Sequence, residues 1–205
     1  PAVTASSIAT VHAVSGGRAV LGIGRGDSAL AHLGFAPAPV PVFEDYLRRV
    51  QGYLRGEEVP FEAGANVKDL KLANVPRSSK IEWLRPGRYP KIPVDVAATG
   101  PKVIRAAAVI ADRITFAVGA APERLRWAMD TARAARRDAG LDPDSMEFGA
   151  YVNVVVHDDP DIARRLGEGG LSLFARFQAM HGHTVGPASE EGKRTSEAVH
   201  DAYDM

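Results

Sequence analysis

The chain has 205 residues, enough for one well-buried core, and its 25 Lys and Arg residues balance its 25 Asp and Glu residues. With no net charge and no long run of one sign, it has no field that attracts nucleic acid or an anionic membrane, so we expect neither as a partner. The absence of cysteine excludes disulfides, thiolate metal sites and a cysteine nucleophile, and it fits a cytoplasmic protein. No apolar stretch reaches membrane-spanning length, and the amino end lacks the pattern of a signal peptide.

The first predicted element is a helix over residues 1–14, which ends at Ser15-Gly16-Gly17, a glycine C-cap. The far end, residues 190–205, is again helix-like, and no initiator methionine precedes Pro1. We therefore expect an internal piece of a longer polypeptide. The apolar residues that share one side of the first helix are Val3, Ile8, Val11 and Val14.

Short apolar runs and helical patterns alternate along the rest of the chain. Strands are predicted over residues 18–24, 93–98, 113–118 and 147–157, the first three as strands buried on both faces. Helices are predicted over residues 40–55, 101–111, 122–139 and 160–180, with Leu125, Met129, Ala132 and Ala135 inward and Arg and Asp outward in the third.

This alternation predicts parallel βαβ units, with the first three strands adjacent in chain order. It leaves two architectures open, an open doubly wound sheet and a closed (β/α) barrel. The irregular stretch 57–92 is long for a connection within a compact domain, so we expect an insertion or lid on the substrate side.

A glycine-rich loop follows the first predicted strand and ends in an acid, Gly22-Ile23-Gly24-Arg25-Gly26-Asp27. A dinucleotide fingerprint would place a third glycine at Asp27, and the acids Glu44 and Asp45 lie in a helical pattern rather than at a strand end, so that interpretation is weak. The glycines are compatible with relief of crowding at a barrel rim. Asp27 either lies at the carboxyl end of a barrel strand, where barrel enzymes have their catalytic residues, or caps the following helix.

A second loop, Thr99-Gly100-Pro101, turns directly into a predicted helix. The free amides and positive dipole at a helix start can bind phosphate, and Lys102 could add charge. An N-cap followed by a helix-starting proline explains the same residues without any ligand. His181-Gly182-His183 has a spacing that a metal could use, but no third ligand stands in register, so we expect a solvated loop and no metal site.

Three motifs in this order and spacing resemble the luciferase-like flavin and deazaflavin oxidoreductases. They are GGRAVLGIGRGDSA at residues 16–29, PVDVAATGP at 93–101 and ADRITFAVG at 111–119. The likeness is greatest to the methylenetetrahydromethanopterin-reductase-like branch, which uses the deazaflavin coenzyme F420. It spans most of residues 1–180.

The resemblance implies an α/β fold, a (β/α)8 barrel of the luciferase-like type present only in part across residues 1–205, with its first strands before Pro1 and its closing strands after Met205. Residues 181–205 would then form a helical segment on the substrate side, and the chain would be marginal alone and prone to self-association. We also expect a homo-oligomer.

The resemblance further implies a cofactor at the carboxyl ends of the strands. Asp27 would be a polar or proton-handling residue near the ring, and Thr99 replaces a glycine of the family's phosphate-binding turn. The expected function is hydride transfer between F420 and an organic small-molecule substrate. An FMN-dependent monooxygenase and a non-catalytic cofactor- or partner-binding protein are the alternatives. The cofactor-binding residues implied are Gly24, Gly26, Ala98, Thr99, Gly100, Pro101, Val118 and Gly119.

Overall fold

The computed structural model describes residues 1–61, 71, 73–83 and 89–203. The chain divides into two compact units. The first consists of residues 1–21 and 41–94, and the second of residues 22–40 and 95–205. Among the described residues, no helix is long and apolar enough to cross a membrane.

The first unit contains α1 (Ala2–Val14) and all of α3 (Val40–Leu54) except its first residue. It also contains the short strands β2 (Val59–Pro60) and β3 (Ser78–Ser79), which pair antiparallel. Leu47 and Val50 of α3 are fully buried, and a hydrogen bond of 2.5 Å joins the Thr4 hydroxyl of α1 to the Tyr46 hydroxyl of α3. The predicted insertion 57–92 thus contains a small hairpin-like pair. Its residues 62–70, 72 and 84–88 lie outside the described residues, and its role as a lid stays a prediction.

Helix α1 forms and ends as predicted, and the side that its valines share is not its buried face. Val3 and Val14 are more than three-quarters exposed, whereas Ala5, Ala9 and His12 are buried. Small side chains at spacings of four and three residues allow close packing, and His12 gains a hydrogen bond from its Nε2 to the Pro90 carbonyl at 3.1 Å. The predicted C-cap is present, with Gly16 and Gly17 both at positive φ.

The second unit is built on a four-stranded sheet with the order β1-β4-β5-β6. Its strands are β1 (Leu21–Ile23), β4 (Val94–Ala98), β5 (Arg113–Phe116) and β6 (Glu147–Ala150). β4 pairs parallel with β5, and β5 pairs parallel with β6. The predicted adjacency of the first three strands in chain order is confirmed.

Burial alternates along β4 and β5. Val94, Val96, Ile114 and Phe116 are fully buried, whereas Asp95 and the other alternate residues are only partly so. The prediction that these strands are buried on both faces is therefore wrong. The cause is visible in the sequence as a polar second face, where the Thr115 hydroxyl donates to the Asp95 carboxylate at 2.8 Å.

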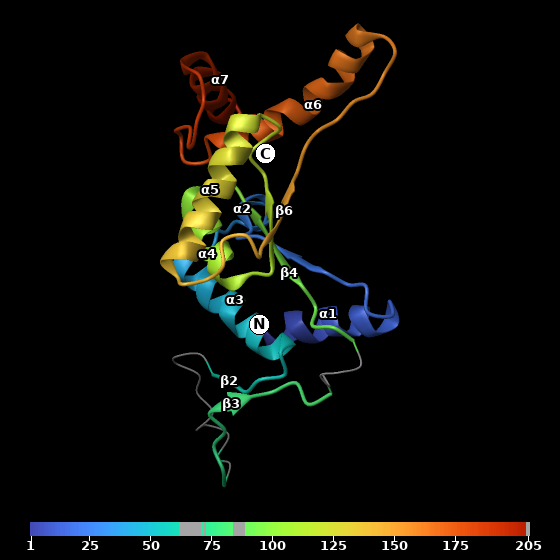
Figure 1. Ribbon diagram of the computed structural model, residues 1–205, viewed down its shortest axis with the longest axis vertical. Coiled ribbons are helices and arrows are strands. Elements are labelled where there is room, and N and C mark those ends of the chain that lie inside the picture. Colours follow the sequence, from blue (N-terminus) through green and yellow to red (C-terminus); the bar gives the residue numbers. More distant parts are fainter. Residues whose placement is uncertain (62–70, 72, 84–88, 204–205) are drawn as a thin grey trace. The chain divides into compact units, whose positions relative to one another are not determined.

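The helices of the second unit are the short α2 (Asp27–Ala31), α4 (Pro101–Ile110), α5 (Pro122–Asp138), α6 (Pro160–Gln178) and α7 (Glu190–Asp201). α4 and α5 lie side by side next to the sheet, and α6 lies beside α7 (Figure 1). Only α2 was not predicted, since five residues are too few to show a periodic pattern. The last two residues of the predicted helix 190–205 lie outside the described residues.

Two further predictions in this unit are wrong in detail. The strand predicted over 147–157 ends at Ala150, and Val154 and Val156 beyond it are largely exposed. Their β-branched composition favours an extended chain, but beyond Ala150 no strand of the described sheet pairs with them. In α5 Ala132 and Ala135 are buried as predicted, but Arg124 and Ala128 are buried rather than Leu125 and Met129, so the inward face is turned from the predicted one and includes an arginine.

Candidate functional site

The glycine loop after β1 owes its shape to Gly26. This residue is the N-cap of α2 at φ 85°, a left-handed conformation that side chains disfavour. A Cβ at Gly26 would lie 2.8 Å from Cγ of Leu30. Gly24 is different, because a Cβ there would lie 3.8 Å from the Ala97 Cβ in ordinary contact. Of the two glycines, only Gly26 has a backbone conformation and a close neighbour that disfavour any side chain.

This difference predicts opposite outcomes for two alanine substitutions. Gly26→Ala should destabilise the protein by about 1–3 kcal/mol, since alanine must adopt a positive φ and displace Leu30. Gly24→Ala should change stability by less than about 0.5 kcal/mol. Urea unfolding of both variants provides the measurement, and equal losses would contradict this account of the loop.

Asp27 is held by an ion pair. Its carboxylate lies 3.1 Å from the Arg25 guanidinium, which also donates to the Ala38 carbonyl at 3.3 Å. Asp27 is the first residue of α2, and no side chain caps that helix, so capping is not its role. The pair holds a carboxylate at the end of β1 with its charge partly balanced.

The second loop leaves a helix start uncapped. Gly100 is the N-cap of α4 and Pro101 follows at the first helical position, with no side-chain hydrogen bond to the cap. The Thr99 hydroxyl therefore does not cap the helix. The amides at the start of α4 have no acceptor within the helix, and the dipole adds partial positive charge there. This is the arrangement that binds an anionic group.

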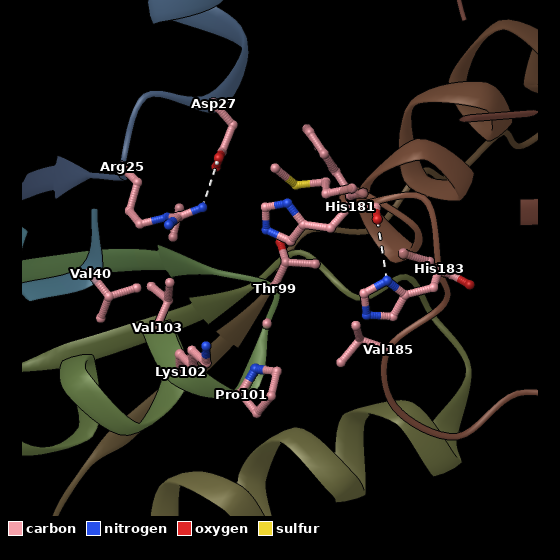
Figure 2. Close-up of a pocket in the computed structure, with 15 residues that line it drawn as sticks. Arg25, Asp27, Val40, Thr99, Pro101, Lys102, Val103, His181, His183 and Val185 are labelled. Atoms are coloured by element: carbon pink, nitrogen blue, oxygen red, sulfur yellow. Dashed lines mark hydrogen bonds and ion pairs between the residues drawn. The ribbon is translucent and has the colours of Figure 1, made fainter. Parts of the chain in front are cut away.

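A cavity of about 410 Å³ opens at this helix start (Figure 2). One side is formed by residues 99–103, and the Arg25–Asp27 pair stands across from them. The remaining lining residues are Val40, Ala97, Phe177, Gln178, Met180, His181, His183 and Val185.

An adjoining cavity of about 710 Å³ runs along the glycine loop. It is lined by residues 22–29, with Ala117 and Tyr151–Asn153 from the ends of the next strands. Because the two cavities share lining residues, they form neighbouring parts of one site. The shared residues are Arg25, Asp27, Ala97, Thr99, Phe177 and Met180.

Helix α6 supplies a wall that sequence analysis did not assign to the site. Nη1 of Arg176 donates to the Ser28 hydroxyl at 2.9 Å, and the guanidinium stacks 4.7 Å from the Tyr203 ring centre. These contacts hold α6 beside the glycine loop. Phe177 and Met180 then offer apolar surface to both cavities, suited to a flat ring.

The two histidines after α6 also belong to the site. His181 and His183 are exposed, as expected for a solvated loop, yet both line the smaller cavity. Nδ1 of His183 lies 3.2 Å from the His181 carbonyl, to which it can donate a hydrogen bond. Within the described part of the chain, no three His, Cys, Asp or Glu side chains are grouped to hold a metal ion.

The structure brings most of the predicted site residues together. Gly24, Gly26 and Thr99 line the larger cavity, and Thr99, Gly100 and Pro101 line the smaller. Asp27 lines both.

The other three predicted residues line neither cavity. Ala98 is buried, and its carbonyl accepts from the Ala117 amide at 2.9 Å. Val118 is buried, and Gly119 turns the chain at φ 82°. These residues shape the strand ends that flank the site.

Comparison with known proteins places the site in a family. The model of the luciferase-like monooxygenase family matches residues 1–204. The chain is 26% identical over 194 residues to 5,10-methylenetetrahydromethanopterin reductase of Methanolobus tindarius, covering 92% of this chain and 56% of the relative. It is 31% identical over 174 residues to a phthiodiolone/phenolphthiodiolone dimycocerosates ketoreductase of Mycobacterium sp. (strain JLS), covering 80% of this chain and 42% of the relative.

The fold agrees with these matches. The solved structure of an F420-dependent secondary alcohol dehydrogenase, in complex with an F420-acetone adduct, superposes with a TM-score of 0.68. It is 16% identical, and the match covers 97% of this chain and 57% of that structure. The predicted α/β fold of the luciferase-like type with a parallel sheet is thereby confirmed. The chain spans about half the length of the curated relatives it matches.

Proposed function

Because the chain belongs to the luciferase-like monooxygenase family, we propose that it carries the cofactor site of an oxidoreductase that transfers hydride between coenzyme F420 and an organic substrate. The observation that carries this proposal is the hollow in which the uncapped start of α4 faces the glycine loop and the Arg25–Asp27 pair. The names of the relatives support the same chemistry, since they describe a reductase, a ketoreductase and an F420-dependent dehydrogenase.

The residues present fit a deazaflavin with a phosphate in its tail. The amides at the start of α4, with Lys102 beside them, match the phosphate. The larger cavity, between the glycine loop and the apolar side chains of Phe177 and Met180, matches the ring. When bound, the deazaflavin supplies a two-electron hydride donor or acceptor.

The chain's own contribution is binding, orientation and charge. Gly24 and Gly26 let the backbone approach a flat ring, because neither has a side chain there. Asp27 stands at the junction of the two cavities and is placed to accept or return a proton as hydride moves. Phe177 and Met180 add apolar surface to the same region, which disfavours water beside a bound ring.

An FMN-dependent monooxygenase is the second candidate, favoured by the description of the matching family model. The same hollow would accept the FMN phosphate and ring. The chemistry separates the two candidates, because a deazaflavin does not form the oxygen adduct that monooxygenation needs. A non-catalytic protein that only binds cofactor or partner would show neither activity.

Titration of the protein with each cofactor decides among these candidates. We expect F420 to bind in the micromolar range or tighter, on the order of −8 kcal/mol, with FMN at least tenfold weaker. Fluorescence and absorbance changes give both affinities. Tighter binding of FMN, with oxygen consumption on reduction, would overturn the proposal in favour of the monooxygenase. Tight F420 binding without turnover of any tested carbonyl or alcohol would favour a non-catalytic protein.

A further inference from the structure

Arg124 is a buried cation that the proposed chemistry does not use. It lies in the first turn of α5, where its charge predicts an exposed position, yet it is 3% exposed. Its guanidinium donates from all three nitrogens: Nε to the Val118 carbonyl at 3.1 Å, Nη1 to the Pro187 carbonyl at 2.9 Å and Nη2 to the Val185 carbonyl at 2.9 Å.

The three acceptors are backbone carbonyls rather than carboxylates, so no ion pair accompanies these hydrogen bonds. Burial lowers the pKa of the Arg124 guanidinium, and the nearby carboxylate of Glu123 opposes that shift only in part. A buried charge is tolerated where its hydrogen bonds are complete. A planar fork reaches three carbonyls at once, which a lysine ammonium on a single stem does not.

The carbonyls belong to two separate segments. Val118 lies two residues after the end of β5 and directly after Ala117, which lines the larger cavity. Val185 and Pro187 belong to the segment of residues 181–187 after α6, which we call the histidine loop because it carries His181 and His183 to the smaller cavity. Arg124 therefore joins the histidine loop to the carboxyl end of the sheet.

The rest of this loop also packs on α5. Gly186 has φ 86°, and a Cβ there would lie 3.0 Å from the Trp127 ring, one helical turn from Arg124. On its other side, the Thr184 amide donates to the Glu197 carboxylate of α7 at 2.9 Å. The cavity side of the loop, by contrast, is formed by the exposed His181 and His183. The loop's position over the cavity thus depends on anchors behind it.

We propose that Arg124 is a positioning residue of the cofactor site: its three carbonyl bonds hold the histidine loop so that His181, His183 and Val185 form a wall of the smaller cavity. This inference rests on the proposed function, in which the anionic part of F420 occupies that cavity. Arg124 itself does not line the cavity and acts through the loop.

The test compares Arg124→Ala and Arg124→Lys with Arg126→Ala, which removes an exposed arginine of the same helix. Three quantities are measured in the protein: the F420 dissociation constant, hydrogen exchange of the amides at 182–186, and thermal stability. Each is repeated with a few millimolar guanidinium, well below denaturing concentrations. Guanidinium can refill the space left by Arg124→Ala and bond the same carbonyls.

We expect Arg124→Ala to raise the F420 dissociation constant on the order of tenfold and to speed exchange in the histidine loop. Added guanidinium should reverse both changes. Arg124→Lys should fall between Arg124→Ala and the parent, and Arg126→Ala should match the parent. If Arg124→Ala does not fold, Arg124→Lys still gives both readouts.

Two results would overturn the inference. One is faster exchange in the loop with unchanged F420 affinity, which would leave Arg124 a purely structural residue. The other is weaker binding with no change in the loop and no rescue by guanidinium. If the parent itself binds no F420, the proposed function fails. In that case unchanged amide exchange at 182–186 in Arg124→Ala would show that the loop does not depend on Arg124 either.

Discussion

Replacing Gly100 with valine is expected to weaken F420 binding on the order of 100-fold, about 2.8 kcal/mol, while thermal stability changes by only a few degrees. Gly100 has φ −91° and ψ 155°, an extended conformation that valine adopts readily. Apart from the two neighbouring residues, no atom lies within 4 Å of a Cβ built there, so the protein has room for the start of a side chain. Because Gly100 lines the smaller cavity at the start of α4, the isopropyl group would take up space where the phosphate is proposed to bind.

The control for this experiment is Gly169→Val. Gly169 is exposed in α6, and a Cβ there also meets nothing within 4 Å. The same substitution away from the cavity should leave F420 affinity within about twofold of the parent. Fluorescence titration gives both affinities. Equal affinity of Gly100→Val and the parent would remove the anion site from the start of α4.

The sequence predicted most helices and strands because proline and glycine clearly mark where its helices begin and end. Prolines at 101, 122 and 160 each stand at the first position of a helix, and glycines at 16 and 140 follow helix ends at positive φ. Adjacent pairing of β4 with β5 follows from a single helix between them.

What failed was the choice of buried face. In α5 Arg124 is buried where an exposed position was predicted. In α1 the sequence indicated only that the valines share a side, and the structure exposes that side and buries alanines. Helical periodicity marks stripes of residues that share a side, but packing decides which stripe is covered. Small residues are buried where two elements pack closely together. An arginine is buried where backbone carbonyls of a distant segment accept its hydrogen bonds.

The site was predicted in its local parts only. The loops at 24–27 and 99–101 follow strand ends, and the carboxyl ends of adjacent strands in a sheet lie near one another. Phe177, His181 and His183 come about 80 residues after the second loop. Residues 181–205 were predicted on the substrate side, but nothing in the sequence indicated that Phe177 or the two histidines line the same cavity as that loop. The contact of Arg176 with Ser28 holds Phe177 beside the glycine loop, and the bonds of Arg124 hold the loop that carries the histidines; no pattern within one segment indicates either contact.

The second large effect is expected at Asp27. Asp27→Asn should lower kcat for hydride transfer on the order of 100-fold while F420 affinity stays within about twofold. Asparagine has the same shape and keeps an oxygen that can accept the hydrogen bond from Arg25, so the loop should hold its conformation. It lacks the negative charge and cannot accept a proton at neutral pH. Steady-state rates and an F420 titration give the two quantities.

Asp130→Asn, which removes an exposed carboxylate of α5, controls for the change in net charge. Its kcat should equal that of the parent. A parallel loss of kcat, F420 affinity and thermal stability in Asp27→Asn would show that the carboxylate serves the loop through Arg25. Unchanged kcat in Asp27→Asn would exclude Asp27 from proton handling. If kcat falls while F420 affinity and thermal stability stay those of the parent, binding and folding are intact. The Asp27 charge must then act on the reacting atoms.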